Sequence, residues 1–272
     1  MKKYPIGFNT RIKKEQEQNS VQAMVQEKSI PRKSVVQVYF PQRDMSWAYY
    51  NDSFDLKVGD FVYVEGKLES HRGQVTEVNY SFKIKASDYK KVIAVIDTNV
   101  KGDFFLAGSH MVSFDRNTIP YSKVLPWFKA PENDAEYISG NDDSSRFPLD
   151  DLSKMKVSQV IAERGHKYYM ENKVAYIEID DTCGRAIVEG GETYEVEFEY
   201  LDGEIMNLKC SCFCSGTCKH EFATMLQLKD SLELIIKNYE DKYDDSYFAL
   251  ISKNVFMTMI MNRNASCKIS LD

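Results

Sequence analysis

The sequence feature that most constrains this chain is a dense group of cysteines. Four of the six cysteines lie within nine positions, and a histidine follows two residues after the last of them, in CSCFCSGTCKH at residues 210–220. Thiolates packed this closely are metal ligands in a reducing compartment, whereas disulfides need an oxidising one. The first eighteen residues contain no apolar stretch of the kind found in a secretory signal. We therefore expect a cytoplasmic protein that binds Zn²⁺ through these residues.

Geometry selects four donors for one tetrahedral zinc ion. Cys210 and Cys212 end a predicted strand, where alternate residues point to one face. Cys218 and His220 begin a predicted helix, whose positive N-terminal end favours a thiolate. Cys214 remains as an alternative ligand in place of Cys212. Because three cysteines and one histidine fill a tetrahedral shell, no position is left for a catalytic water, and we expect a structural zinc rather than an enzyme.

The segments around the cysteines predict an α+β zinc-binding domain over residues 153–237. A helix is expected to begin at Ser153 and to continue through Gly165. Strand-like runs follow at 174–179, 185–190, 193–200 and 204–209. Asp202-Gly203 joins the last two runs and is typical of a type I′ hairpin turn. A C-terminal extension over 238–272 is expected to hold a helix at 247–261 and a strand at 267–271.

One of these strands has a strict alternation that bears on function. In residues 193–200, aromatic and aliphatic side chains alternate with Glu195, Glu197 and Glu199. Because successive residues of a strand point to opposite faces, the glutamates form an acidic face that is expected to point to water. Such a face would repel a phosphate backbone.

The zinc segment resembles the SWIM zinc finger, which occurs with bacterial and archaeal Swi/Snf-type ATPases, plant transposases and eukaryotic recombination factors. The matching residues are Cys-x-Cys-x5-Cys-x-His with Lys219 before the histidine and, upstream, Arg164-Gly165, Tyr168-Tyr169 and the runs at 174–179 and 194–200. The resemblance covers residues 153–230, under a third of the chain. Phe213-Cys214 departs from the family, which often has a proline and no third thiol there. The resemblance implies a zinc-stabilised module that binds DNA or protein partners and is not a catalyst.

Residues 34–130 predict a second, all-β domain that resembles a small SH3-like or OB-like barrel. Short runs rich in β-branched and aromatic residues are separated by glycine turns, at 35–40, 47–50, 60–66, 73–82 and 90–97. The polar residues 1–33 are expected to be a mobile arm. Residues 131–152 gather Pro, Gly, Asn, Asp and Ser, and they predict a linker between the two domains.

This first domain also resembles, more weakly, the small β-barrel of primosomal replication-restart helicases. The resemblance is carried by Val36-x-Val38, Tyr49-Tyr50, Gly73-x-Val75 and the string Leu56-Lys57-Val58-Gly59-Asp60-x-Val62-x-Val64. It implies a module that binds the 3′ end of DNA. The same string recurs in many small barrels because Gly-Asp makes the turn before a buried strand, so a barrel with another ligand stays an alternative.

Composition and charge limit the possible functions. The chain is 43% apolar and 28% charged, as in ordinary globular proteins, and no apolar run approaches the roughly 18 residues of a membrane-spanning helix. The net charge is −6, and residues 154–272 carry fourteen Lys and Arg against twenty Asp and Glu. No segment is the strongly basic block typical of sequence-independent nucleic-acid binding. No nucleotide-binding or hydrolase motif occurs, so no small-molecule substrate is expected.

Two functions remain open after these observations. The first is a DNA-binding or DNA-transaction accessory factor, working beside a helicase-like ATPase on another chain. Its candidate nucleic-acid contacts are Lys209, Lys219, Lys229, Trp47, Tyr49 and Tyr50. The alternative is a protein-interaction adaptor whose zinc only stabilises the fold. The acidic charge favours the adaptor, and the two resemblances favour the DNA-binding factor.

Overall fold

The computed structural model describes residues 31–131, 146–239, 247–260 and 267–270, which form an α+β fold with two separate sheets. The contacts divide the chain into two units, each with its own hydrophobic core. The five-stranded unit comprises described residues 31–98 and 122–131, and the nine-stranded unit comprises the other described residues. Residues 1–30 of the predicted polar arm lie outside the described residues. None of the described helices combines the length and apolarity needed to cross a membrane.

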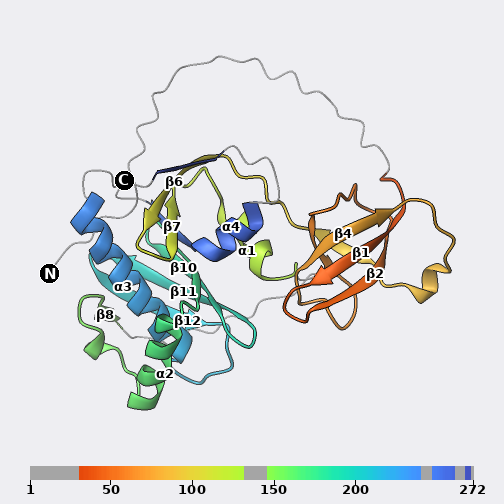
Figure 1. Ribbon diagram of the computed structural model, residues 1–272. Helices are drawn as coiled ribbons and strands as arrows, with labels where there is room; N and C mark the ends of the chain where they lie inside the picture. The colour runs from red at the N-terminus through yellow and green to blue at the C-terminus, as the bar shows by residue number, and fades with distance from the viewer. Residues whose placement is uncertain (1–30, 132–145, 240–246, 261–266, 271–272) are drawn as a thin grey trace. The chain divides into compact units, whose positions relative to one another are not determined.

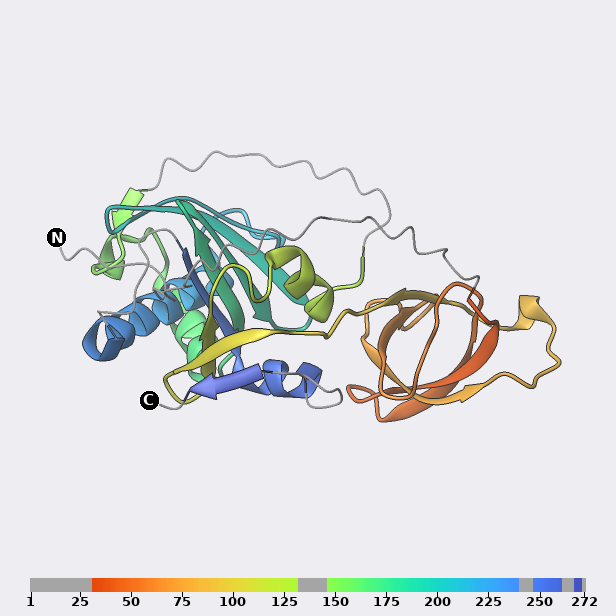
Figure 2. The same ribbon diagram turned by 90° about the horizontal axis from the view of Figure 1, so that it is seen from above.

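The five-stranded unit is an antiparallel sheet with the strand order β2-β1-β4-β3-β5. An isolated bridge between Tyr50 and Lys91 joins β2 to the chain before β5, so the strands curl around a common interior (Figure 2). In β1 every second residue from Ser34 to Phe40 is buried, which is the alternation that the sequence predicts. The strands are β1 Ser34–Phe40, β2 Met45–Asn51, β3 Phe61–Val64, β4 Gly73–Asn79 and β5 Val92–Val95, with a 3₁₀ turn at Ala86–Asp88.

The boundary between the units differs from the predicted barrel over 34–130. Strands β6 (Gly102–Ala107) and β7 (Met111–Phe114) pair within the nine-stranded sheet. Helix α1 (Tyr121–Phe128) then leads the chain back to the five-stranded unit, where Trp127 is fully buried and its Nε1 donates to the carbonyl of Asp97 at 2.8 Å. An apolar strand carries no mark of the sheet that it will join, so the sequence pattern could not place this boundary.

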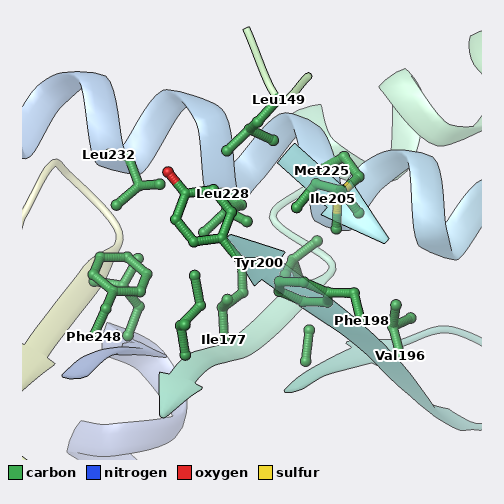
Figure 3. Packing of buried hydrophobic residues seen from close by; sticks show 14 of the residues in the cluster. Leu149, Ile177, Val196, Phe198, Tyr200, Ile205, Met225, Leu228, Leu232 and Phe248 are labelled. Atoms are coloured by element: carbon green, nitrogen blue, oxygen red, sulfur yellow. The ribbon is translucent and has the colours of Figure 1, made fainter. Parts of the chain in front are cut away.

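The nine-stranded unit has the strand order β14-β6-β7-β13-β9-β10-β11-β12-β8, with all neighbours antiparallel except β14 and β6. Helix α3 packs across β9, β11 and β12, and helix α2 packs on α3 (Figure 1). Figure 3 shows the core between α3 and the sheet, where Leu228 and Leu232 of α3 lie near Ile177 and Tyr200 of the sheet. The remaining elements are β8 Arg146–Pro148, α2 Gln159–Met170, β9 Val174–Asp180, β10 Cys183–Glu189, β11 Thr193–Leu201, β12 Glu204–Cys210, α3 Lys219–Tyr239, β13 Tyr247–Ser252, α4 Lys253–Ile260 and β14 Cys267–Ser270.

Two predictions about the start of this unit need correction. Part of the predicted linker 131–152 is structured, because β8 pairs with β12 and Phe147 is buried in the core. The helix expected to begin at Ser153 begins at Gln159, where Ser158 is the cap and its side chain accepts from the N–H of Ile161. Ser153 lies instead in a 3₁₀ turn that Asp151 caps.

The helix predicted over 247–261 is also wrong in its first half. Residues 247–252 form strand β13, which pairs with β7 on one side and β9 on the other. Its first five residues are all buried, and such a continuous apolar run cannot be distinguished from a buried helix by periodicity. The predicted C-terminal strand is confirmed as β14.

Gly165 sets the distance between α2 and α3. A Cβ atom at this position would lie 2.9 Å from the backbone oxygen of Lys219 and 2.8 Å from Cδ1 of Phe222, closer than real Cβ contacts. Only glycine therefore lets α2 approach the first turn of α3. The helix continues through this glycine, as the sequence predicts.

Candidate metal centre

A tight hairpin and a β-bulge bring the first two cysteines to the inner face of the sheet. Asp202 and Gly203 both have positive φ, 51° and 86°, as the predicted type I′ turn requires. The pairing of β11 with β12 then shifts register, and Asn207 opposite the shift has φ 52°. Buried residues before and after it, Ile205 and Leu208, are three positions apart instead of two.

This extra residue decides which way the cysteines face. Without the extra residue, every second residue after Ile205 would face inward. Cys210, five positions later, would then point away from α3. With it, Cys210 shares a side with Leu208 and packs against the core under α3. Pairing continues one step further, since the N–H of Ser211 donates to the carbonyl of Glu195 at 2.9 Å. Cys212 then follows on the same side.

The second pair of donors opens helix α3 through a capping box. Cys218 is the residue before the helix, and its Sγ accepts from the N–H of Glu221 at 3.4 Å. The Glu221 carboxylate accepts in return from the N–H of Cys218 at 2.6 Å. Cysteine thus takes the place that Ser or Thr has in the usual motif. The arrangement fixes the Cys218 sulfur at the positive end of α3, two residues before His220.

The four ligand atoms of Cys210, Cys212, Cys218 and His220 lie within 4.8 Å of one another, a group that can hold a metal ion. Nδ1 of His220 is 3.6 Å from Sγ of Cys210 and 3.7 Å from Sγ of Cys218. A tetrahedral zinc with Zn–S of about 2.3 Å and Zn–N of about 2.0 Å separates sulfur from nitrogen by about 3.5 Å. The donor set and its spacing therefore fit a zinc ion.

The surroundings of His220 keep its ring neutral and fixed. The ring stacks on Tyr194 at 4.0 Å between centroids and meets Tyr168 edge-on at 5.4 Å. Burial, and secondly the charge of Lys219, lower the pKa of His220 to about 4. Nε2 is buried and has no hydrogen-bond partner among the described residues. Neutral imidazole with Nδ1 toward the sulfurs is the form that a metal binds.

The three cysteine sulfurs of this group lie within 4.8 Å of one another. The hydrogen bond with Cys210 is the main cause that raises the pKa of Cys218, and burial adds to it. Burial, followed by the charge of Cys218, raises the pKa of Cys212 to about 12. Thiolates this close together repel one another, so a divalent cation is the group that would stabilise their charged form.

The alternative ligand Cys214 lies outside this group of four. It is exposed, and its N–H donates to the carbonyl of Cys212 at 2.9 Å. Phe213 beside it is fully exposed at the tip of the loop. The structure therefore brings together the four donors selected from the spacing and leaves the fifth thiol at the surface.

The three lysines that were candidate nucleic-acid contacts do not form one cluster. Lys219 Nζ lies over the ring of Tyr168, 4.5 Å from its centroid. Lys209 pairs in register with Glu197. Lys229 lies ten residues after Lys219 in α3, about 15 Å away by helical rise. Its Nζ donates to the carbonyl of Asp150 at 2.7 Å. Lys229 is therefore away from the metal ligands at the start of α3.

The three aromatic candidates of the five-stranded unit also separate. Tyr49 and Tyr50 are buried in or beside the core, whereas Trp47 is 57% exposed. Of the three, only Trp47 is exposed to solvent. The two buried tyrosines pack in the interior of the unit, as aromatic residues on a curled sheet ordinarily do.

Two residues that position the site were not singled out from the sequence. Glu221 stands three positions after Cys218, which is the spacing of a capping box, and this signal could have found it. Asn207 was signalled only by the break in alternation between Ile205 and Leu208. Comparison of the chain with family models, curated proteins and solved structures found no significant match.

Proposed function

We propose that Cys210, Cys212, Cys218 and His220 bind one Zn²⁺ and that this ion is structural. The observation that carries the proposal is the convergence of four ligand atoms within 4.8 Å, at the junction of β12 and α3. Four protein donors complete a tetrahedral shell and leave no open position for substrate or water. The ion would join the hairpin to the helix, and the protein would have no catalytic activity of its own. We also propose, from the resemblance of the sequence motif alone, that this zinc segment is of the SWIM type.

Metal analysis tests the zinc proposal directly. Protein that is purified without metal-affinity chromatography and dialysed against buffer should contain one zinc per chain by inductively coupled plasma mass spectrometry. Replacement by Co²⁺ should give the visible absorption bands of tetrahedral cobalt with thiolate ligands. A protein that contains no metal and does not take up Co²⁺ would contradict the proposal.

We further propose that the protein is a DNA-binding accessory factor that works beside a helicase-like ATPase on another chain. Both sequence resemblances support this role, and so does the distribution of charge. The described residues of the five-stranded unit carry twelve Lys and Arg against nine Asp and Glu, a net +3. Those of the nine-stranded unit carry fifteen against nineteen, a net −4. The five-stranded unit is therefore the better candidate for the nucleic-acid contact.

The alternative is a protein-interaction adaptor. It is favoured by the acidic face of β11, where Glu197 and Glu199 are exposed, and by the exposed ring of Phe213. The acidic face is unfavourable beside phosphates, and an exposed aromatic ring suits a protein interface.

Binding measurements at several salt concentrations distinguish these two functions. Fluorescence anisotropy of the zinc-loaded full chain would be measured with labelled single-stranded, duplex and 3′-recessed DNA. Binding that weakens linearly on a log–log plot against salt would support phosphate neutralisation. Flat titrations with all three DNAs would support the adaptor instead.

A further inference from the structure

The five-stranded unit contains an open cleft of about 550 Å³ that neither the metal site nor the core explains. One wall is the start of β2, with Met45 and Trp47. The loop after β3, including Glu65 and Lys67, and the chain before β5, at Lys90, form the other walls. All of its lining residues belong to this one unit.

Trp47 is the exposed aromatic residue that lines this cleft. It pairs in register with the fully buried Val38, so both side chains point to the inner face of the sheet. Tyr49, two residues further along β2, is 6% exposed, but Trp47 is 57% exposed. Its Nε1 donates to Sδ of Met45 at 3.2 Å, which orients the indole. Strand β2 thus places two aromatic residues along the cleft, the buried Tyr49 and the exposed Trp47.

Three cations, Arg43, Lys67 and Lys90, line the same cleft. Arg43, Lys67 and Lys90 form no ion pair among the described residues, although Nε of Arg43 donates to Nε2 of His71 at 3.3 Å. The one carboxylate in the wall, Glu65, accepts from the backbone N–H of Lys91 at 3.0 Å, and its charge leaves the lining with a net charge of +2. By contrast, Lys91 outside the cleft is paired with Asp52 at 2.9 Å. The cleft therefore combines an exposed indole with a net positive charge.

We infer that this cleft binds single-stranded nucleic acid, with an unpaired base stacked on Trp47 and phosphates beside Arg43, Lys67 and Lys90. The inference rests on the proposed nucleic-acid function and gives it a site and a class of ligand. Every base has a π face that can stack on an indole, whereas the bases of a duplex are already stacked. A cationic ligand would be repelled, and a neutral apolar ligand would leave the three charges without a partner.

Affinities of cleft variants test this inference. Full-length, zinc-loaded protein is titrated into fluorescein-labelled dT15 and anisotropy is recorded. Trp47→Ala should bind at least about tenfold more weakly, which is the usual loss for a stacking residue. Lys67→Ala/Lys90→Ala should bind more weakly and reduce the slope of log K against log salt by roughly 1.4. Lys83→Ala, which removes an exposed lysine outside the cleft, should bind like the unaltered protein.

Two further measurements separate stacking from charge. An oligonucleotide of the same length with abasic sites keeps the phosphates and removes the bases. It should bind the unaltered protein more weakly than dT15 does, and Trp47→Ala should not distinguish the two. The chain has two tryptophans, and the other one, Trp127, is fully buried. Quenching of tryptophan fluorescence by dT15 therefore reports on Trp47.

The outcomes distinguish the inference from the function on which it rests. If dT15 binds but Trp47→Ala and the double lysine variant bind it equally well, the cleft is not the site, although the nucleic-acid function stands. If no nucleic acid binds, both fail. If free dTMP quenches Trp47 with the affinity of dT15, the ligand is a nucleotide and the strand is excluded. Circular dichroism checks that each variant is folded.

Discussion

Cys218 is both a metal ligand candidate and the cap of helix α3. Its thiol accepts from the N–H of Glu221, and its own N–H donates to the Glu221 carboxylate. Serine is among the best capping residues, so Cys218→Ser retains the capping group and removes the thiolate. The substitution therefore tests the metal role separately from the helix cap.

We predict that Cys218→Ser loses the zinc and unfolds the nine-stranded unit around it. In small metal sites the binding free energy is a large part of the folding free energy. Zinc content by mass spectrometry and far-ultraviolet circular dichroism would measure both effects. Cys214→Ser is the matched control, because it removes an exposed thiol four residues away and should keep the metal. Equimolar zinc in Cys218→Ser, with an unchanged spectrum, would overturn the ligand assignment.

Tyr63 gives the five-stranded unit a dependence on alkaline pH. Its side chain is fully buried, and its hydroxyl has no hydrogen-bond partner among the described residues. Burial raises the pKa of Tyr63 from 10.0 to about 12, against the opposing charge of Arg72. Between pH 10 and 12 the unfolded chain loses this proton and the folded chain keeps it. This group therefore leaves the free energy of unfolding unchanged below pH 10. The free energy of unfolding should fall, by up to about 2 kcal/mol, as pH rises toward 12.

Urea unfolding followed by tryptophan fluorescence at pH 8 and pH 11 measures this effect. Both tryptophans belong to the five-stranded unit, so the signal reports on that unit alone. Tyr63→Phe should reduce the difference between the two pH values and should stabilise the unit at pH 8 by about 1 kcal/mol, because it removes an unpaired buried hydroxyl. An equal loss at pH 11 in both proteins would show that another group titrates.

The residues of the metal site could be predicted from spacing, but not all of their orientation. Four cysteines within nine positions and a histidine two residues later leave few ways to complete a tetrahedron. Which nitrogen of His220 faces the sulfurs depends on the packing of Tyr168 and Tyr194, which come from distant parts of the chain. Such contacts exist only in the folded unit.

At the scale of elements, the bulge in β12 controls the direction of the ligands. Asn207 has φ 52°, a conformation that glycine and asparagine adopt easily and β-branched residues do not. We predict that Asn207→Gly keeps the zinc and that Asn207→Val weakens zinc binding, because valine opposes the bulge by about 1–2 kcal/mol or more. Competition with a zinc chelator would rank the affinities. Equal affinities of the glycine and valine variants would show that the bulge does not position Cys210.

The contact between α2 and α3 offers a second test at this scale. Alanine is a better helix former than glycine by about 1 kcal/mol, so Gly165→Ala should stabilise an isolated α2. In the folded unit its Cβ would meet the Lys219 carbonyl and the Phe222 side chain. Overpacking costs about 1–3 kcal/mol, so we expect a net destabilisation and weaker zinc retention. Higher thermal stability of Gly165→Ala would contradict the close approach of the helices.

The elements themselves were predicted where alternation and turn residues agree. The hairpin of β11 and β12 follows from Asp202-Gly203 and from the regular alternation of residues 193–200. Strand β13 was predicted as helix because Phe248 and Ile251 continue the helical spacing of Val255 and Met259, although the strand is buried almost throughout. The membership of β6 and β7 depends on pairing with β13, more than 130 residues later, and no local pattern contains that information.

At the scale of the whole molecule, the two units have separate cores and separate reporters. Tryptophan fluorescence reports on the five-stranded unit, and metal release reports on the nine-stranded unit. We predict that a strong chelator unfolds the nine-stranded unit while the tryptophan emission maximum stays unchanged. Loss of circular dichroism without a shift in emission is the expected result. A parallel shift in emission would show that the units unfold together.

Strand β13 has a consequence for how the protein is made. It is the only link between β7 and β9 in the described sheet, yet it follows almost all of the chain. A ribosome adding about 5–20 residues per second leaves the inner edges of β7 and β9 unpaired for on the order of ten seconds after β7 emerges. Unpaired edges invite association between nascent chains. A fragment that stops after α3 would keep those edges permanently, so work on the isolated zinc region should include the chain through β13.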